Sequence, residues 1–314
     1  MASARRRDAR RHRASDGGVM TVETVPKVAI FTLTYDRAEY TERMLESLEQ
    51  STTIPYDHFI VDNGSRDATH ELLERWRGRL KRVLVNDENR GISLASNQAL
   101  DMIGDDYDYI VKMDNDCQAS TEGWLEKLIE VCEADVSGIV LSPYVRGLEG
   151  GEFPGGYPRT EHTTIAGRPV GLTKHLGGIC LLAPTAAYEG FRFPTAVPLH
   201  GNQDVLFSIH VRSQCGYRMG YVEDVIVDSM EGQLQYLRYP EYFAERRNEA
   251  RQVYGETTLM TKLATPVRKI RLIRAMRKAG LSDRTVMTAA VDRVRRACGL
   301  DPRDKWDEGR KEWT

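Results

Sequence analysis

The stretch Tyr-Asp-Tyr-Ile-Val-Lys-Met-Asp-Asn-Asp-Cys, residues 107–117, decides the fold class, because an apolar run ends there in two closely spaced carboxylates. Residues 107–113 have the length and composition of a buried strand. In open parallel sheets, ligands bind just beyond the carboxyl ends of the strands. We therefore expect Asp114 and Asp116 to share Mn²⁺ or Mg²⁺ with a diphosphate, since these ions take oxygen ligands from protein, phosphate and water. A turn or a cap would use the same residues, and is the alternative.

Strands and helices alternate on both sides of this stretch. Further strands are expected at residues 28–34, 56–61, 82–85 and 138–142, and helices at 38–50, 68–76, 92–103 and 124–132. This alternation predicts an α/β fold with a mostly parallel sheet flanked by helices. Residues 143–175 are rich in Gly and Pro and are expected to form a loop-rich insertion with edge strands. Regular structure is expected again at 175–183, 204–214, 217–227 and 240–254.

Composition excludes several classes of protein. The 314 residues are 41% hydrophobic, which is enough for a packed core. No apolar run approaches the roughly 18 residues of a membrane-spanning helix, and the N-terminus lacks the apolar segment of a secretory signal. The five cysteines are scattered without a Cys-x-x-Cys pair. This scatter argues against a zinc module or a disulfide framework and favours a cytoplasmic location.

The net charge of −2 conceals an acidic body with basic ends. Residues 1–13 carry a net charge of +5, residues 262–296 carry +9 and residues 297–314 carry −1, which leaves −15 for residues 14–261. We predict a basic arm, an α/β domain and a basic helical extension, at residues 1–24, 25–260 and 261–314. The basic ends favour contact with a polyanion or with an anionic membrane surface. A solvated arm and a helix packed on the domain are the alternatives.

Polar side chains follow the other predicted strands as well. They are Thr34, Tyr35 and Arg37 after the first strand, Asp62 and Asn63 after the second, and Asn89, Arg90, Gly91 and Asn97 after the third. Because the carboxyl ends of parallel strands meet at one edge of the sheet, these residues are expected to line one site with Asp114 and Asp116.

These motifs, in this order, resemble those of family 2 glycosyltransferases, which have the GT-A nucleotide-sugar-binding fold. The resemblance covers about residues 27–230. It is carried by IFTLTYDR at 30–37, VDNGSRD at 61–67, NRG at 89–91 with Asn97, KMDND at 112–116, LGGICLL at 176–182, NQDV at 202–205 and GYR at 216–218. The resemblance implies a nucleotide-sugar half at about 25–142 and an acceptor half at about 143–260.

The resemblance also implies roles for individual residues. Asp62 would accept a hydrogen bond from the imide N–H of a uracil-type base, although a helix cap or an Asx turn would use it equally well. Asp114 and Asp116 would hold the metal and the sugar phosphate. The implied nucleotide-sugar-binding set is Thr34, Tyr35, Arg37, Asp62, Asn63, Asn89, Arg90, Gly91, Asn97, Lys112, Asp114 and Asn115.

Asp204 is the expected general base, because transfer with inversion needs one carboxylate beside the acceptor hydroxyl. The alternative is a cap for the helix that starts at Val205. Two departures from the family pattern are visible: Gln203 stands where Glu is common, and Asp228 stands near the position of a metal-binding His. Asp228 is therefore a candidate third metal ligand or a turn residue. Gly178, His200 and Gln203 are expected on the acceptor side.

The chain is thus expected to be a metal-dependent, inverting glycosyltransferase that uses a nucleotide-diphosphate sugar, with UDP favoured. Two acceptor classes fit the basic ends: a cell-envelope or lipid-linked glycan reached at an anionic membrane, and a hydroxymethylated base in DNA. A nucleotidyltransferase acting on sugar phosphates is an alternative, although a glycine-rich loop after the first strand is lacking. A non-catalytic sugar-nucleotide-binding protein is another, because of the two departures. The oligomeric state is left open.

Overall fold

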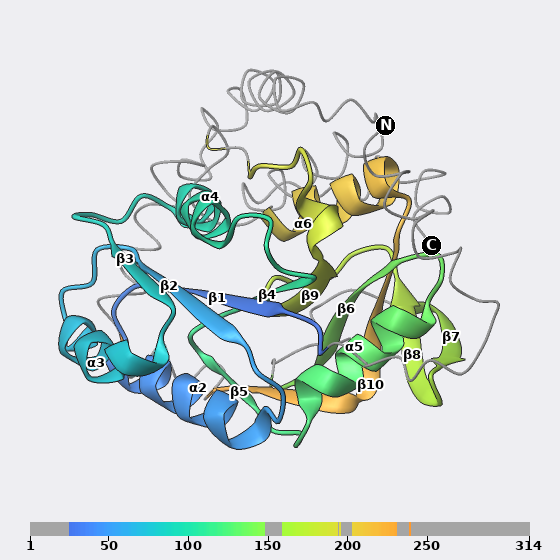
Figure 1. The fold of residues 1–314 in the computed structure, drawn as a ribbon, viewed down its shortest axis with the longest axis horizontal. Helices are drawn as coiled ribbons and strands as arrows, with labels where there is room; N and C mark the ends of the chain where they lie inside the picture. Colours follow the sequence, from blue (N-terminus) through green and yellow to red (C-terminus); the bar gives the residue numbers. More distant parts are fainter. Residues whose placement is uncertain (1–24, 148–158, 194, 196–202, 231–238, 240–314) are drawn as a thin grey trace, which may run out of the picture.

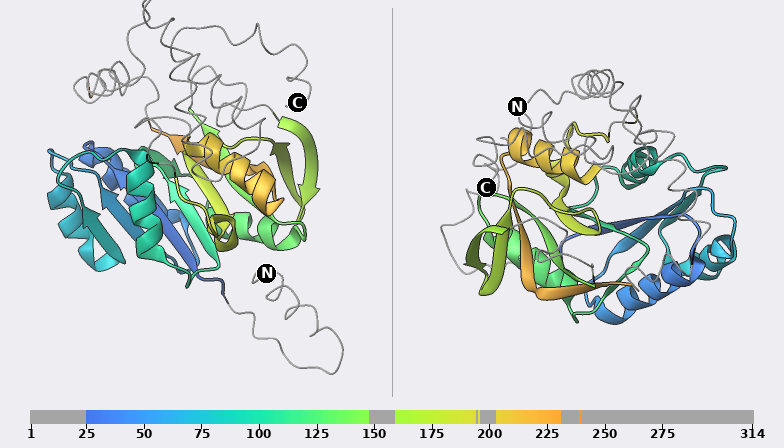
Figure 2. Two further views of the ribbon diagram at one scale, coloured as in Figure 1. Left: turned by 90° about the horizontal axis from the view of Figure 1, so that it is seen from above. Right: turned by 180° about the vertical axis from the view of Figure 1, so that it is seen from behind.

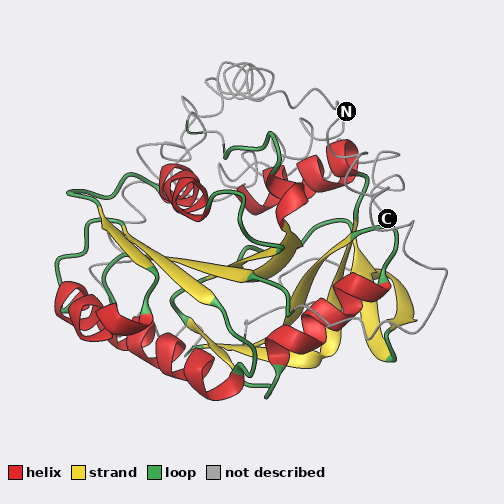
Figure 3. Cartoon of the chain, viewed as in Figure 1, coloured by secondary structure: helices red, strands yellow, loops and turns green. Residues whose placement is uncertain are grey.

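The computed structural model describes residues 25–147, 159–193, 195, 203–230 and 239. These residues form three layers, with a mixed sheet between two groups of helices (Figures 1 and 3). One face carries α2 (Ala38–Ser51), α3 (Thr69–Trp76) and α5 (Trp124–Ala134). The other face carries α4 (Ile92–Ile103) and α6 (Gln203–His210), which lie on the same side of the sheet in every view (Figure 2). The predicted α/β class is confirmed.

The sheet has the strand order β3-β2-β1-β4-β9-β6-β10-β8-β7, and a short β5 pairs with β10 outside this path. Its strands are β1 (Val28–Thr34), β2 (Asp57–Asp62), β3 (Arg82–Val85), β4 (Tyr109–Met113), β5 (Cys117–Ala119), β6 (Ile139–Arg146), β7 (Arg159–Ile165), β8 (Arg168–Thr173), β9 (Cys180–Pro184) and β10 (Arg218–Ser229). The first four strands pair in parallel, and so do β6 and β10. Strand β9 runs antiparallel between β4 and β6 and joins the two parallel groups.

Each face of the sheet has its own apolar core. Tyr40, Met44 and Leu48 recur on one side of α2 at helical spacing, and they pack with Trp124 of α5 in the first core. The second core lies under α4 and α6 and includes Phe31 of β1, together with Ala95, Ala99 and Phe207. Because β1 supplies alternate residues to the two cores, it is buried on both faces. This burial explains the nearly continuous apolar sequence of the strand.

Several predicted boundaries shift in the structure. The insertion at 143–175 contains a β7–β8 hairpin, and the regular segment expected at 175–183 is the shorter strand β9. The helix expected at 204–214 ends its α-helical part at His210 and continues as a π-helix, Val211–Cys215. The predicted basic arm, most of the segment 240–254 and the C-terminal extension lie outside the described residues. Among the helices that the structure does describe, none is long and apolar enough to cross a membrane.

Candidate active site

The predicted site residues meet at one edge of the sheet because their strands end in register. Thr34 is the partner of Asp62 across β1 and β2, and Asp62 is the partner of Val85 across β2 and β3. On the other side of β1, β4 runs parallel and leads directly into Asp114. The carboxyl ends of four parallel strands therefore present their polar residues at the same rim, as the sequence predicts.

Arg37 holds the Asp-Asn-Asp stretch from the end of β1. Its guanidinium donates to Asp116 Oδ2 and to Asn115 Oδ1, each at 3.0 Å, and its side chain is only 7% exposed. Asn115 in turn donates to the hydroxyls of Thr34, at 3.3 Å, and Thr41, at 3.0 Å. Asp36 and Arg37 both have positive φ, 53° and 62°, a conformation that is unfavourable for residues other than glycine.

Lys112 links the end of β4 to the segment around Gly178. Its ammonium donates to Asp114 Oδ1 and to the carbonyl oxygen of Gly178. A Cβ placed on Gly178 would lie 3.5 Å from Asp204 Cβ and 3.5 Å from Lys112 Nζ. Asp114, Lys112, Gly178 and Asp204 therefore form one contiguous group, although their positions in the chain span more than ninety residues.

The electrostatics of this group are those of a partly buried ion pair. Burial alone would lower the pKa of Lys112, but the Asp114 carboxylate outweighs this effect and the net shift is upward. Partial burial raises the pKa of Asp114, an effect that Lys112 opposes and the neighbouring Asp116 strengthens. Asp204 also acts on Lys112 as a nearby negative charge. The ammonium is thus surrounded by carboxylates on both sides.

Asp62 is fully buried and has partners on both carboxylate oxygens. Ser65 donates to Oδ1 through its hydroxyl and through its backbone N–H, the latter at 3.3 Å. Nε2 of His70, a half-exposed residue in the first turn of α3, lies 2.6 Å from Oδ2. Burial raises the pKa of Asp62, and the hydrogen bonds from Ser65 and His70 oppose the shift. The Asx-turn role and the ligand-binding role predicted for Asp62 are therefore compatible.

An amide network shapes the next part of the rim. Asn63 donates to Asn89 Oδ1 at 2.8 Å and accepts from the side chain of Asn86 and from the backbone N–H of Arg90. Asn89 also accepts from the N–H of Gly91 at 3.0 Å, where α4 begins. The loops after β2 and β3 are therefore fixed to each other by side chains that the sequence analysis assigned to ligand binding.

Tyr35 and Asn97 have structural partners in addition to their predicted roles. The hydroxyl of Tyr35 accepts from Arg66 at 2.8 Å, and the Arg66 guanidinium lies over the Tyr35 ring at 5.8 Å. Asn97 donates to the carbonyl oxygen of Phe193 at 2.9 Å and accepts from its N–H at 2.8 Å. Asn97 thus attaches the segment around Phe193 to α4.

Asp228 has a different environment from the one predicted for a third metal ligand. It forms a two-point ion pair with Arg146, whose NH2 group lies 2.8 Å from Oδ2, and it also accepts from Ser120. The hydrogen bond from Arg146 lowers the pKa of Asp228. Within the described part of the chain, no three His, Cys, Asp or Glu residues form a group that could hold a metal ion. Asp114 and Asp116 alone still fit Mg²⁺ or Mn²⁺, because such ions are commonly held by one or two carboxylates and completed by substrate phosphates.

Several residues that hold this rim together were not predicted from the sequence, and one predicted residue lies outside the described part of the chain. Thr41, Ser65 and His70 hold predicted site residues by hydrogen bonds, but they sit on helix faces or in turns where such residues are ordinary. Only Ser65 lay within a quoted motif. Gln203 is the buried first residue of α6, next to Asp204. His200 lies outside the described residues.

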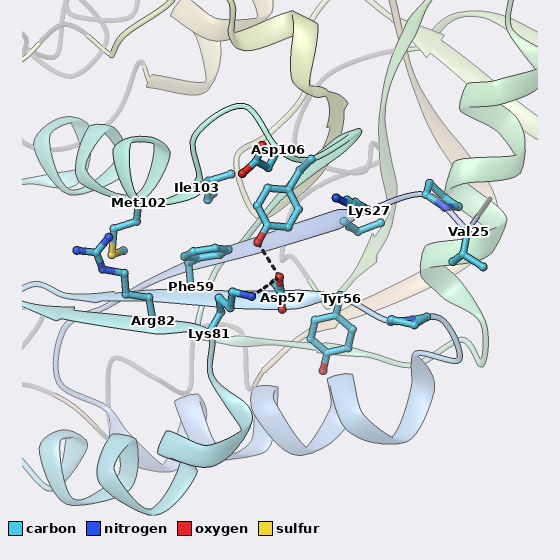
Figure 4. A pocket seen from close by; sticks show the side chains of 14 residues that line it. Val25, Lys27, Tyr56, Asp57, Phe59, Lys81, Arg82, Met102, Ile103 and Asp106 are labelled. Atoms are coloured by element: carbon cyan, nitrogen blue, oxygen red, sulfur yellow. Dashed lines mark hydrogen bonds and ion pairs between the residues drawn. The ribbon is translucent and has the colours of Figure 1, made fainter.

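A cavity of about 620 Å³ lies at the opposite, amino-terminal ends of the parallel strands (Figure 4). Asp57, the first residue of β2, accepts there from the hydroxyl of Tyr107 at 2.7 Å and pairs with Lys81 at 3.1 Å. Because Asp62 is the last residue of the same strand, this cavity is separated from the rim by the length of β2. It shares no lining residue with the candidate active site.

Comparisons with known proteins agree with this geometry. The family model described as glycosyl transferase family 2 matches residues 29–187. A search of the curated proteins finds no match. Among solved structures, the mannosyltransferase PcManGT from Pyrobaculum calidifontis, in complex with GDP-Man and Mn²⁺, gives a TM-score of 0.53 at 16% identity, covering 99% of this chain and 92% of that one.

Two longer structures are similar to the same degree. S. aureus TarS gives a TM-score of 0.53 at 15% identity, covering 91% of this chain and 55% of that one. GalNAc-T7 with UDP, GalNAc and Mn²⁺ gives 0.53 at 15% identity, covering 77% and 54%. The present chain therefore spans about half the length of these two proteins. At such identities the likeness to solved structures establishes the fold.

Proposed function

Because the chain belongs to glycosyl transferase family 2, we propose that it transfers a sugar from a nucleotide-diphosphate donor, a UDP-sugar in the first instance, to an acceptor hydroxyl. The observation that carries this proposal is the contiguous group of Asp114, Lys112, Gly178 and Asp204. This group joins Asp114, which would help to hold the diphosphate, to Asp204, which would act on the acceptor.

On the donor side, the base would bind at Asp62 and the diphosphate beside Asp114 and Asp116. Asp62 is held by Ser65 and His70 with its carboxylate fixed, which suits recognition of an imide N–H. Asp114 and Asp116 would hold Mn²⁺ or Mg²⁺, which when bound neutralises charge on the leaving diphosphate. The solved structures of GalNAc-T7 and PcManGT named above are complexes with Mn²⁺, which supports this choice of ion.

On the acceptor side, Asp204 would remove the proton from the attacking hydroxyl. It sits at the start of α6, across Gly178 from Lys112. A single displacement with inversion needs one such base and no covalent intermediate on the protein.

The acceptor would be either a cell-envelope or lipid-linked glycan, or a hydroxymethylated base in DNA. The acidic body with basic ends supports both, because either acceptor lies on an anionic surface. Binding of the full chain to duplex DNA and to anionic vesicles, each measured across a salt series, separates the two. Absence of binding to either at low salt would argue for a small-molecule or protein acceptor.

A thermal-shift screen of the full chain against UDP-, GDP-, dTDP- and CDP-sugars, with and without Mn²⁺, tests the proposal. A ligand that binds only the native state raises the melting temperature by mass action. We expect one nucleotide class to stabilise the protein, and more strongly with Mn²⁺. Release of a nucleoside diphosphate during turnover supports glycosyl transfer, whereas release of pyrophosphate identifies a nucleotidyltransferase. Stabilisation without turnover on any acceptor would identify a binding protein.

A further inference from the structure

Both carboxylates of the Asp-Asn-Asp stretch already have a cationic partner from the chain itself. Asp114 Oδ1 accepts from the Lys112 ammonium, and Asp116 Oδ2 accepts from the Arg37 guanidinium at 3.0 Å. Neither cation is a mobile surface group, because the side chains of Lys112 and Arg37 are only 15% and 7% exposed. Each carboxylate of the Asp-Asn-Asp stretch is therefore matched by one cation from the chain itself, and Asp204 is a further negative charge beside Lys112.

This charge balance bears directly on metal binding. A divalent cation that approaches Asp114 and Asp116 is attracted by two carboxylates but repelled by an ammonium and a guanidinium within the same few ångströms. The described residues supply no third acidic or imidazole ligand that would make metal binding more favourable. The oxygens of a diphosphate would favour metal binding, because they add both ligands and negative charge.

We propose that Lys112 and Arg37 are resident counter-cations of Asp114 and Asp116, so that a divalent cation binds there tightly only together with the donor diphosphate. The inference rests on the proposed function, since it takes the donor to be a nucleotide diphosphate. It adds that metal and donor enter the site as mutually dependent ligands, each raising the affinity for the other.

The two cations have unequal parts in this arrangement. Arg37 is tied to Asn115 as well as to Asp116, and Asn115 is fixed by the Thr34 and Thr41 hydroxyls. Lys112 has a flexible stem, and the carbonyl oxygen of Gly178 and the nearby Asp204 remain as its partners when Asp114 turns to the metal. Lys112 is therefore the cation that releases its carboxylate when the metal binds, whereas Arg37 holds Asp116 in position.

Binding of Mn²⁺ alone to the full chain tests the proposal without any turnover. We would titrate Mn²⁺ by electron paramagnetic resonance and by calorimetry, with and without UDP, on the wild type and on Lys112→Gln. The wild type should bind Mn²⁺ weakly alone and much more tightly with UDP. Lys112→Gln should bind Mn²⁺ alone about tenfold more tightly, because a repelling charge is gone, and UDP should improve its affinity less.

Lys81→Gln is the matched control, since Lys81 also pairs with an aspartate but at the far end of β2. It should leave Mn²⁺ affinity unchanged. Equal Mn²⁺ affinity with and without UDP in the wild type would overturn the proposal even if Lys112→Gln failed to fold. An unchanged affinity in a folded Lys112→Gln would do the same. Binding of UDP in either case would leave the proposed function standing, whereas failure to bind any nucleotide would count against that function.

Discussion

Nε2 of His70 lies 2.6 Å from Oδ2 of Asp62, so the carboxylate expected to read the base is held from the first turn of α3. Asp62 is buried, whereas the His70 side chain is 50% exposed. A carboxylate has about four acceptor positions, so Asp62 can keep Ser65 and His70 and still accept from a base. In this arrangement His70 positions Asp62 and need not touch the base itself.

Replacing His70 should therefore weaken donor binding more than it slows the chemical step. His70→Ala removes one hydrogen bond to a buried carboxylate, which is worth about 1.5–3 kcal/mol. We expect the KM for the donor to rise roughly tenfold or more, with kcat changed little, and His70→Gln to restore much of the loss through its amide N–H. Steady-state kinetics with the donor varied measures this split.

His162→Gln is a suitable control, because His162 is an exposed residue of β7 that pairs with Glu223 at 3.3 Å, away from the rim. Its kinetic constants should match the wild type. A donor KM for His70→Ala equal to that of the wild type would show that Asp62 holds its orientation without His70.

The role of Asp204 on the acceptor and the role of Asp116 in metal and donor binding should be separable by mutation. Asp204→Asn should lower kcat by about 10²–10⁴-fold, the usual contribution of a general base, and leave UDP binding intact. Asp116→Ala should abolish both transfer and Mn²⁺-dependent UDP binding. Calorimetry with UDP and Mn²⁺ beside an activity assay distinguishes them, and circular dichroism confirms that each variant is folded. Turnover near the wild-type rate in both variants would contradict the assignment of the site.

Local patterns in the sequence were sufficient to predict the strand ends, but not what lies across them. The apolar runs at Val28–Thr34 and at 107–113 predict buried strands that end in polar residues. Parallel pairing then brings those ends together at one edge of the sheet. The position of β9 between β4 and β6 has no local signal, and it is β9 that brings Gly178 to Lys112. The Arg146 partner of Asp228 has no local signal either, because it comes from the neighbouring strand β6.

Gly64, in the Asp-Asn-Gly-Ser turn, should not tolerate a side chain. Its φ is +83°, and a Cβ there would lie 2.6 Å from the backbone carbonyl carbon of Glu88. Gly64→Ala should therefore lower the free energy of unfolding by roughly 1–3 kcal/mol and weaken donor binding, because the turn carries Asp62 and Asn63. Denaturant unfolding and UDP titration would measure the two effects.

Gly78→Ala is the matched control for this turn. No atom lies within 4 Å of a Cβ built on Gly78, and its φ is not in the left-handed region. This variant should match the wild type or exceed its stability slightly, since alanine reduces the conformational entropy of the unfolded chain. Equal stability of the two alanine variants would mean that the Glu88 backbone moves aside at little cost.

Because of His58, the free energy of unfolding of the protein should fall in mild acid. It is buried in β2, where its Nε2 lies 3.1 Å from the Thr32 hydroxyl, and burial lowers its pKa from 6.5 to about 3. Between these two values the unfolded chain binds a proton that the folded chain does not. His58 therefore contributes stability that is present above pH 6.5 and is lost as the pH falls, by about 1.4 kcal/mol per pH unit.

Urea unfolding of the wild type and of His58→Gln at several pH values between 7 and 4 should show a shallower decline in the variant, whatever its stability at pH 7. Parallel declines in the wild type and His58→Gln would show that the folded protein accommodates the His58 proton.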